Sequence, residues 1–306
     1  MRLVVALGGN ALLRRGELPD AAVQQRNVRA AVRALAPLAR EHELVVTHGN
    51  GPQVGVLALQ SASNPHLTTP YPFDVLGAQT QGMIGYWLLQ AVQNAVPGRQ
   101  VAAVLNQTLV EAADPAFADP TKFVGEVYDE QTARALARER GWAVKPDGPG
   151  WRRVVGSPRP REVVETPLIR LLLDNGVVVV CAGGGGVPVV RDPDGTLRGV
   201  EAVVDKDLTS AVLAQALGAE VLLVLTDVAH VERHFGTDRA EPIRRATPAQ
   251  LRAEEFAPGS MGPKVDAVCR FVEATGGTAS IGRLEDAVAL LAGTAGTVVT
   301  GSAGAP

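Results

Sequence analysis

Lysine is scarce in this 306-residue chain. Only four of the 29 basic residues are lysines, and arginine fills the other 25 positions. Arginine therefore serves wherever a generic surface cation is needed. Because a compact ammonium group and a forked guanidinium are not equivalent, each remaining lysine is a candidate for a specific role. The four are Lys122, Lys145, Lys206 and Lys264.

Features of membrane, secreted and nucleic-acid-binding proteins are also missing. No apolar stretch approaches the ~20 residues that a membrane-spanning helix needs, and the apolar run at the N-terminus is too short for a signal-peptide core. The net charge of −3 offers no basic surface to nucleic acid. Cys181 and Cys269 are too few for a disulfide framework or a zinc site, and we interpret both as core residues. We expect a cytoplasmic protein that binds neither membrane nor nucleic acid.

Two common phosphate-binding motifs are absent as well. No G-x-x-x-x-G-K-[ST] occurs, and the glycines of "GNGPQVG" and "GGGGVP" miss the spacing of G-x-G-x-x-G. A P-loop is thereby excluded, and a dinucleotide-binding fold gains no support. His230 and His234 are four residues apart, as in a zinc pair on a helix, but they lack the H-E-x-x-H order, so we interpret them as surface residues.

Short apolar runs alternate with longer amphipathic stretches. Continuous hydrophobicity favours strands of a parallel sheet that is buried on both faces. The expected strands cover residues 2–7, 43–48, 101–106, 177–182, 221–226 and 297–301. The expected helices cover about 21–40, 74–95, 166–175, 208–217, 263–275 and 285–292, with Pro263 at a first helical position. This alternation predicts an α/β fold: a three-layer α/β/α sandwich with an open, mainly parallel central sheet.

Residues 111–161 interrupt this alternation. The segment is rich in Pro, Asp, Gly and Arg, and a disordered loop of this length would be unusual inside a compact α/β domain. Its aromatic residues favour a small folded unit instead: Phe117, Phe123, Tyr128, Trp142 and Trp151. We expect a single domain over residues 1–306 with a protruding subdomain or lid inserted at 111–161.

Three of the expected strands run directly into glycines. Ligands of open α/β sheets bind at the carboxyl ends of strands, where glycine lets the backbone approach and offers N–H groups to anions. A single such turn would be explained by tight turn geometry alone, but three favour a floor for oxyanions or phosphate. The glycines concerned are Gly8 and Gly9, then Gly49, Gly51 and Gly55, and finally Gly183 to Gly186.

Two of the lysines stand near expected helix starts. Lys206 in "DKDLTS" and Lys264 in "GSMGPK" occupy positions where free N–H groups and the helix dipole favour anions. Lys122 lies inside the 111–161 segment, whereas Lys145 has no comparable context and is interpreted as an ordinary surface lysine. Asp207 is either a first-turn residue stabilised by the dipole or a carboxylate that holds two ammonium groups. Lysines, glycine amides and a metal suit phosphoryl transfer to an acceptor oxygen that is already anionic and needs no general base.

A chain of motifs closely resembles the carbamate kinases, a family within the amino-acid kinase superfamily. The similarity runs from the first strand to about Asp286 and includes "ALGGNALLRRGE", "VVTHGNGPQVG", "QTQGMIGYWL", "DPAFADPTKFVG", "GWRRVVGSPRP", "CAGGGGVPVVRD", "GVEAVVDKDLTS", "LTDV" and "GSMGPKV". The resemblance implies an α/β/α sandwich, usually a homodimer, with a protruding subdomain. It implies the reaction ATP + carbamate ⇌ ADP + carbamoyl phosphate with Mg²⁺, running toward ATP in arginine catabolism.

The resemblance also implies roles for particular residues. Lys122, Lys206 and Lys264 would surround the transferring phosphoryl group, and Asp207 would orient the lysines. The carbamate and phosphate end would be held by Gly8, Gly9, Asn10, Gly49, Asn50 and Gly51. The nucleotide side would comprise Thr226, Asp227, Val228, Gly259, Gly262 and Met261, with Met261 against the adenine. Mg²⁺ would arrive with the nucleotide, and no metal ligand from the protein is predicted.

Some positions depart from the family pattern. Ala229 replaces an acidic residue, Glu232 stands where a tyrosine would help to wall the adenine pocket, and Glu126 and Val127 change a less acidic, more aromatic stretch. These departures bear on nucleotide affinity and donor identity. Two alternatives stay open: a related enzyme that phosphorylates another small carboxylate or phosphonate, and a sensor of nucleotide or metabolite without turnover. The intact trio of lysines argues against a sensor, which has little use for charges aimed at a transition state.

Overall fold

An eight-stranded sheet forms the centre of the computed structural model, which describes residues 1–14, 16–257 and 259–302 except for the side chain of Asn10. The strand order is β15–β17–β16–β12–β1–β2–β9–β3, and neighbours are parallel apart from the antiparallel pair β16 and β17. The strands are β1 (Arg2–Leu7), β2 (Glu43–His48), β3 (Val101–Ala103), β9 (Val178–Cys181), β12 (Val221–Thr226), β15 (Arg245–Ala246), β16 (Thr278–Arg283) and β17 (Thr297–Val299). The expected α/β class with a mainly parallel sheet is confirmed.

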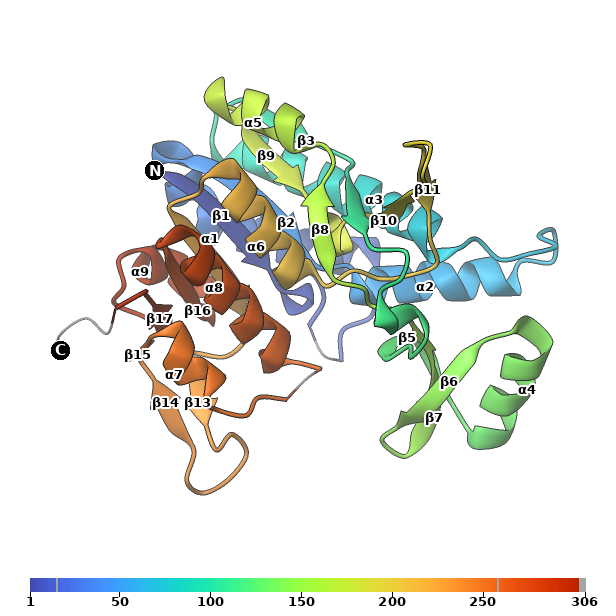
Figure 1. The fold of residues 1–306 in the computed structure, drawn as a ribbon. Helices are drawn as coiled ribbons and strands as arrows, with labels where there is room; N and C mark the ends of the chain where they lie inside the picture. Colours follow the sequence, from blue (N-terminus) through green and yellow to red (C-terminus); the bar gives the residue numbers. More distant parts are fainter. Residues whose placement is uncertain (15, 258, 303–306) are drawn as a thin grey trace.

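Helices cover both faces of this sheet (Figure 1). Alternate residues of β1 belong to two different apolar clusters, with Val4 and Ala6 in one and Leu3 and Val5 in the other. The first cluster is completed by α5 (Thr166–Asp174), α6 (Lys206–Leu217), α7 (Pro248–Arg252) and α8 (Met261–Thr275). The second is completed by α1 (Ala21–Glu41), α3 (Phe73–Ala95) and α9 (Ala287–Leu291). Burial on both faces is why the strands are apolar without alternation.

Several elements differ from the sequence expectation. Helix α2 (Gly51–Ser63) and strand β16 were not expected, β3 ends at Ala103, and the last helix is split into η4 (Leu284–Asp286) and α9. Helix α8 begins at Met261, so the expectation that Pro263 occupies the first helical position is wrong. The third position accepts proline because the first four N–H groups of a helix have no intrahelical partner.

The segment between β4 (Gln107–Val110) and β8 (Pro160–Val163) is folded, as its aromatic residues predicted. It contains η2 (Pro115–Phe117) and a separate three-stranded sheet in the order β5–β7–β6, which carries α4. The bounds are β5 (Lys122–Tyr128), α4 (Glu130–Arg140), β6 (Ala143–Asp147) and β7 (Gly150–Val155). In Figure 1 this sheet and α4 project at the lower right. The domain boundaries at 111 and 161 stay a prediction.

Two smaller sheets complete the fold. A four-stranded sheet has the order β11–β10–β4–β8, and a hairpin pairs β13 with β14. The remaining bounds are η1 (Gly9–Ala11), η3 (Gly183–Gly185), β10 (Val187–Arg191), β11 (Leu197–Gly199), β13 (Val231–Arg233) and β14 (Glu241–Ile243). Cys181 and Cys269 are buried free thiols, as expected of core residues. Within the described ranges, every helix is too short or too polar to cross a lipid bilayer.

Candidate active site

Glycine turns at the carboxyl ends of β1, β2 and β9 lie side by side because these strands are neighbours in the sheet. A Cβ atom on Gly49 would stand 3.1 Å from the backbone nitrogen of Gly9, and one on Gly184 would stand 2.2 Å from Asn50 Nδ2. Gly184 also has a φ of +63°, which L side chains rarely adopt. Side chains at these positions would push the turns apart.

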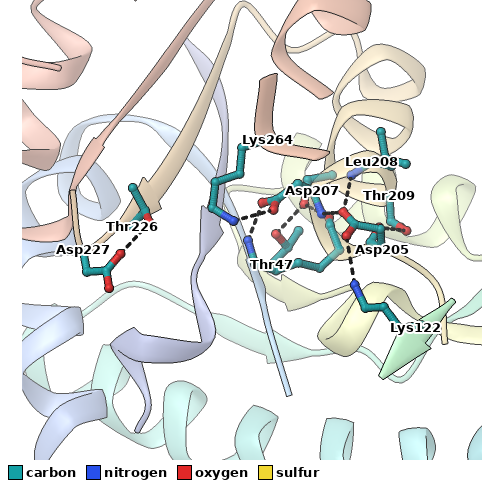
Figure 2. A network of polar contacts seen from close by, with 11 residues as sticks. Thr47, Lys122, Asp205, Asp207, Leu208, Thr209, Thr226, Asp227 and Lys264 are labelled. Carbon is teal, nitrogen blue, oxygen red and sulfur yellow. Dashed lines mark hydrogen bonds and ion pairs between the residues drawn. The ribbon is translucent and has the colours of Figure 1, made fainter. Parts of the chain in front are cut away.

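The buried carboxylate of Asp207 contacts two lysines. Asp207 is the second residue of α6, and 2% of its surface is exposed. Its Oδ2 accepts from Lys264 Nζ at 3.1 Å, and its Oδ1 accepts from Lys206 Nζ. Figure 2 shows Lys264 reaching down from α8 to this carboxylate. The two ion pairs therefore join the first turns of α6 and α8.

The charges in this cluster depend on one another. Burial pushes the pKa of Asp207 upward, but the ammonium groups of Lys206 and Lys264 outweigh burial and hold that pKa below its usual value. Burial, assisted by Lys264 and opposed by Asp207, lowers the pKa of Lys206. Because an unpaired buried charge is strongly unfavourable, Asp207 is what allows two ammonium groups to share this position.

A third lysine reaches the same place from β5. Lys122 Nζ lies 3.3 Å from Oδ2 of Asp205, which directly precedes α6. Asp205 is the N-cap of α6, and its Oδ1 accepts from the N–H groups of Asp207 and Leu208 at 3.0 and 3.3 Å. Lys145, by contrast, pairs with Asp119 at the surface at 2.7 Å. The three lysines that the sequence set apart are thus grouped around α6, and Lys145 is not.

These groups line one cavity of about 610 Å³. The N-termini of α2, α6 and α8 meet its wall, so free N–H groups and three helix dipoles favour an anion there.

The predicted residues on the wall are Gly9, Gly49, Asn50, Gly51, Lys122, Gly184, Lys206, Asp207, Gly259 and Lys264. Gly8 and Gly183 pack against the chain instead, with Cβ positions 3.1 Å from the Leu225 oxygen and 2.4 Å from His48 Cε1. The predicted side chain of Asn10 lies outside the described part of the structure.

His48, the last residue of β2, is buried beneath the glycine turn at Gly183. Its Nδ1 lies 3.0 Å from the Gly49 oxygen. Burial lowers the pKa of His48 to about 4, and the nearby Lys206 ammonium acts in the same direction. His48 is therefore neutral at physiological pH and supports the turn. Sequence analysis assigned it no role.

Two buried polar side chains on α3, those of Thr80 and Gln81, fix the neighbouring turns. Asn50 Nδ2 donates to Thr80 Oγ1 at 2.8 Å, and Gln81 bonds both the N–H and the C=O of Asn106 at 3.0 and 3.1 Å. Asn106 Oδ1 in turn accepts from the Ala182 N–H at 2.6 Å. Sequence analysis missed these roles. The available signal was a pair of polar residues, Thr80 and Gln81, on the otherwise apolar face of an expected helix.

The residues expected to bind the nucleotide do not all line the same cavity in this structure. Gly259 lines the lysine cavity, and Gly262 lies in the first turn of α8. Thr226 and Asp227 line a second cavity of about 580 Å³, and Figure 2 shows them on the far side of Lys264 from Asp205. Met261 packs against an apolar core cluster with Phe256. Val228 follows β12 and is half-buried.

The positions that depart from the family pattern lie in two places, one at β13 and the other on β5. Glu232 is on β13, and Ala229 precedes it in the connection from β12. Glu126 lines the lysine cavity, while Val127 is 51% exposed. His230 and His234 flank β13 and are not on a helix, and Arg244 Nη1 contacts His230 Nε2.

Two carboxylates at the cavity, those of Asp205 and Asp207, are engaged by lysines. Over residues 1–14, 16–257 and 259–302, no three His, Cys, Asp or Glu side chains gather closely enough to hold a metal ion. Asp205 and Asp207 each contact an ammonium group. The oxygens of a polyphosphate could supply further ligands to a cation bound here.

Comparisons with known proteins show the family of this chain. Residues 1–282 match the model of the amino acid kinase family. The carbamate kinase of Rhizobium meliloti is 51% identical, over 99% of this chain and 94% of that protein, and that of Escherichia coli K12 is 49% identical over 97% and 99%. The solved structure of Giardia lamblia carbamate kinase bound to AMP-PNP superposes with a TM-score of 0.91 at 39% identity, covering 98% of both chains. The chain belongs to the amino acid kinase family and, within it, to the carbamate kinases.

Proposed function

We propose that the lysine cavity transfers a phosphoryl group between ATP and carbamate: ATP + carbamate ⇌ ADP + carbamoyl phosphate. The observation that carries this proposal is one buried aspartate that holds two ammonium groups beside a cavity reached by a third lysine. A carboxyl-type oxygen is anionic, so the acceptor needs no general base. The transferring phosphoryl group instead needs its charge neutralised and its two oxygen partners held in line.

In this proposal Lys206 and Lys264 bind the oxygens of the transferring phosphoryl group, and Asp207 fixes both ammonium groups. Lys122 approaches from β5 on another side. A carbamate oxygen forms the new O–P bond as the bond between the γ-phosphorus and the bridging oxygen of ADP breaks, and no net proton is moved. Neutral, buried His48 is consistent with a step that uses no histidine base.

The glycine turns would hold the carbamate and phosphate end. Gly9, Gly49, Gly51 and Gly184 line the cavity and offer backbone N–H groups to oxyanions. Gly8 and Gly183 would act by allowing the turns to pack closely. Asn50, held by Thr80, would present its amide to the small acceptor, and we assign Asn10 to the same end.

The nucleotide would enter between the turn after β12 and the start of α8. Gly259, Gly262 and Met261 at α8, with Thr226, Asp227 and Val228 after β12, are the residues that we assign to it. The solved relative that holds AMP-PNP supports an adenine nucleotide as the phosphoryl donor. Mg²⁺ would be carried by the phosphates, where it neutralises charge, since Asp205 and Asp207 pair with lysines.

We further propose net synthesis of ATP in arginine catabolism, because carbamoyl phosphate is a mixed anhydride and the stronger phosphoryl donor. A cytoplasmic location fits the substrates. A homodimer fits the exposed apolar side chains near the β3 edge of the central sheet, where Tyr86 of α3 is 55% exposed and Leu105 is 54% exposed. The opposite side of α3, with Ile84 and Leu88, belongs to the core.

The deciding experiment supplies purified protein with ADP, carbamoyl phosphate and Mg²⁺ and measures ATP. ATP should form, and chelation of Mg²⁺ should abolish its formation. Absence of ATP together with phosphorylation of another small carboxylate or a phosphonate would reassign the acceptor. Nucleotide binding without any transfer would mean a sensor, and sedimentation of the same sample would report the oligomeric state.

A further inference from the structure

One carboxylate joins the inserted sheet to the start of α6. Oδ1 of Asp205 accepts from the backbone N–H groups of Asp207 and Leu208, while Oδ2 lies 3.3 Å from Lys122 Nζ. Figure 2 shows these contacts on the two sides of the same side chain. Asp205 therefore has two functions at once: an N-cap for the helix that carries Lys206 and Asp207, and a counter-ion for the lysine of β5.

Lys122 needs such a partner more than the other two lysines. The side chains of Lys206 and Lys264 are 11% and 18% exposed, and both are fixed by Asp207. The side chain of Lys122 is 40% exposed and comes from a sheet that projects from the body. A lysine has a flexible four-carbon stem with considerable rotamer entropy, so an exposed ammonium group points into the cavity only if another charge attracts it.

The net charge at the cavity also favours an anionic phosphoryl group. The wall carries Arg152 and three ammonium groups against the carboxylates of Asp205, Asp207 and Glu126, which leaves one net positive charge among these seven side chains. The separation of 3.3 Å between Lys122 and Asp205 is long for a charged hydrogen bond. An incoming phosphoryl oxygen can therefore share or replace this contact at a small cost.

We propose that Asp205 is a positioning residue for phosphoryl transfer, which holds Lys122 over the cavity and aligns it with Lys206 and Lys264. This inference rests on the proposed role of Lys122 in the reaction. In this proposal Asp205 acts through Lys122 and needs no contact of its own with either substrate. It acts by keeping the ammonium group of Lys122, on the projecting sheet, close to the first turn of α6.

Asp205→Asn separates the two functions of this side chain. Asparagine is as good an N-cap as aspartate, so the contacts with Asp207 and Leu208 remain while the attraction to Lys122 is lost. We expect kcat for ATP formation to fall about tenfold, the KM for ADP to change less than about twofold, and the Tm to stay within about 2 °C of that of the parent protein. Unchanged kcat would overturn the proposal, as would a fall in Tm that accounts for the lost activity.

A double-mutant cycle with Lys122→Ala tests whether the effect of Asp205→Asn on kcat depends on Lys122. On the Lys122→Ala background, Asp205→Asn should lower kcat by less than about twofold, because no ammonium group remains to be positioned. Equal losses on both backgrounds would show that Asp205 acts independently of Lys122. Full turnover by Lys122→Ala alone would refute the proposed role of Lys122 and this inference with it, whereas a slow Lys122→Ala beside a fully active Asp205→Asn would refute this inference alone.

The chain offers a matched control. Asp119 pairs with Lys145 at 2.7 Å, so Asp119→Asn also removes the acid of a Lys–Asp pair, but at the surface and away from the cavity. We expect its kcat and Tm to match those of the parent protein. A loss of kcat in Asp119→Asn equal to that in Asp205→Asn would show a general response to lost charge, and would contradict a specific role for Asp205.

Discussion

At the position of Lys264, an ammonium group faces Asp207 in a chain whose basic residues are mostly arginine. Asp207 has two carboxylate oxygens, and each already receives one ammonium group. A guanidinium is planar and favours a bidentate contact with both oxygens of one carboxylate. Arginine at this position would therefore compete with Lys206 for Asp207 instead of pointing a charge into the cavity.

Lys264→Arg should lower kcat for ATP formation by at least about a hundredfold while the fold is retained, because the point charge aimed at the phosphoryl group is lost. The assay with ADP and carbamoyl phosphate measures the effect, and circular dichroism checks the fold. Lys145→Arg is the control, since its surface ion pair tolerates the exchange. Near-normal turnover by Lys264→Arg would count against the role assigned to that ammonium group.

His48 gives a prediction about pH. The unfolded imidazole titrates near 6.5, whereas burial and Lys206 hold the pKa of the folded residue at about 4. Above pH 6.5 the ring is neutral in both states. Between 6.5 and 4 only the unfolded state takes up the proton, so the free energy of unfolding falls with decreasing pH, by up to about 3 kcal/mol from this residue. Proton NMR of the His48 ring should show no titration from pH 8 to 5, and a midpoint near 6.5 would contradict the burial argument.

At the scale of elements, the turn after β9 requires glycine at position 184 for two separate reasons. Gly184 has a positive φ, and the space where a Cβ would stand is occupied by the Asn50 side chain at 2.2 Å. Gly148, in the turn between β6 and β7, has a similar φ of +60° but nothing within 4 Å of that Cβ position. The two positions therefore share the conformational cost of a side chain and differ in the steric cost.

Gly148→Ala should lower the free energy of unfolding by about 1–2 kcal/mol, the cost of a left-handed L-residue, and leave kcat unchanged. Gly184→Ala should lower it by about 2–5 kcal/mol, because overlap with Asn50 is added. It should also reduce kcat, since Asn50 and the glycine turn are displaced. Urea unfolding and the ATP assay test both variants, and equal effects at the two positions would show that steric contact with Asn50 is unimportant.

The same scale shows what sequence could and could not predict. Buried parallel strands such as β1 and β12 are continuous apolar runs, and their bounds were predicted correctly. Strand β16 was missed because its sequence, "TASIGR", contains small and polar residues that do not form an apolar run. Helix α2 was missed because "GNGPQVG" indicates a turn, and the turn and the helix start occupy the same residues.

The site residues likewise fall into those that the sequence could predict and those that it could not. Lysine in an arginine-rich chain singled out Lys206 and Lys264, and the family resemblance assigned Asp207 to them. The structure brings the three together. Asp205 and His48 carry no such signal, because an aspartate before a helix is an ordinary cap and a histidine at a strand end is unremarkable. Their importance comes from neighbours that are distant in sequence, Lys122 and Gly183.

At the scale of the whole molecule, the projecting sheet is attached to the body at a second place besides Lys122. Arg153 of β7 lies between the rings of Trp142 and Phe73, at 4.5 and 5.0 Å from their centroids. It donates to Glu201 Oε1 at 2.6 Å, and Glu201 Oε2 accepts from the Phe73 N–H at the start of α3 at 2.8 Å. Glu201 belongs to the chain that leads into α6, so this joint connects the sheet, α3 and the lysine site.

Arg153→Met should loosen this joint, because methionine keeps the apolar contact with the two rings but loses the cation and the ion pair with Glu201. The orientation of the sheet that carries Lys122 would then vary, and we expect kcat/KM for carbamoyl phosphate to fall about tenfold with faster proteolysis of the 111–161 segment. Arg134→Met is the control, since Arg134 stacks on Trp151 at 4.7 Å and pairs with Glu130, entirely within the projecting unit. If both variants lost kcat/KM equally, stability of the projecting unit and not its attachment would govern the site. If Arg153→Met kept full kcat/KM, then Asp205 and the apolar contacts of Val124 and Val155 would suffice to hold Lys122 in place.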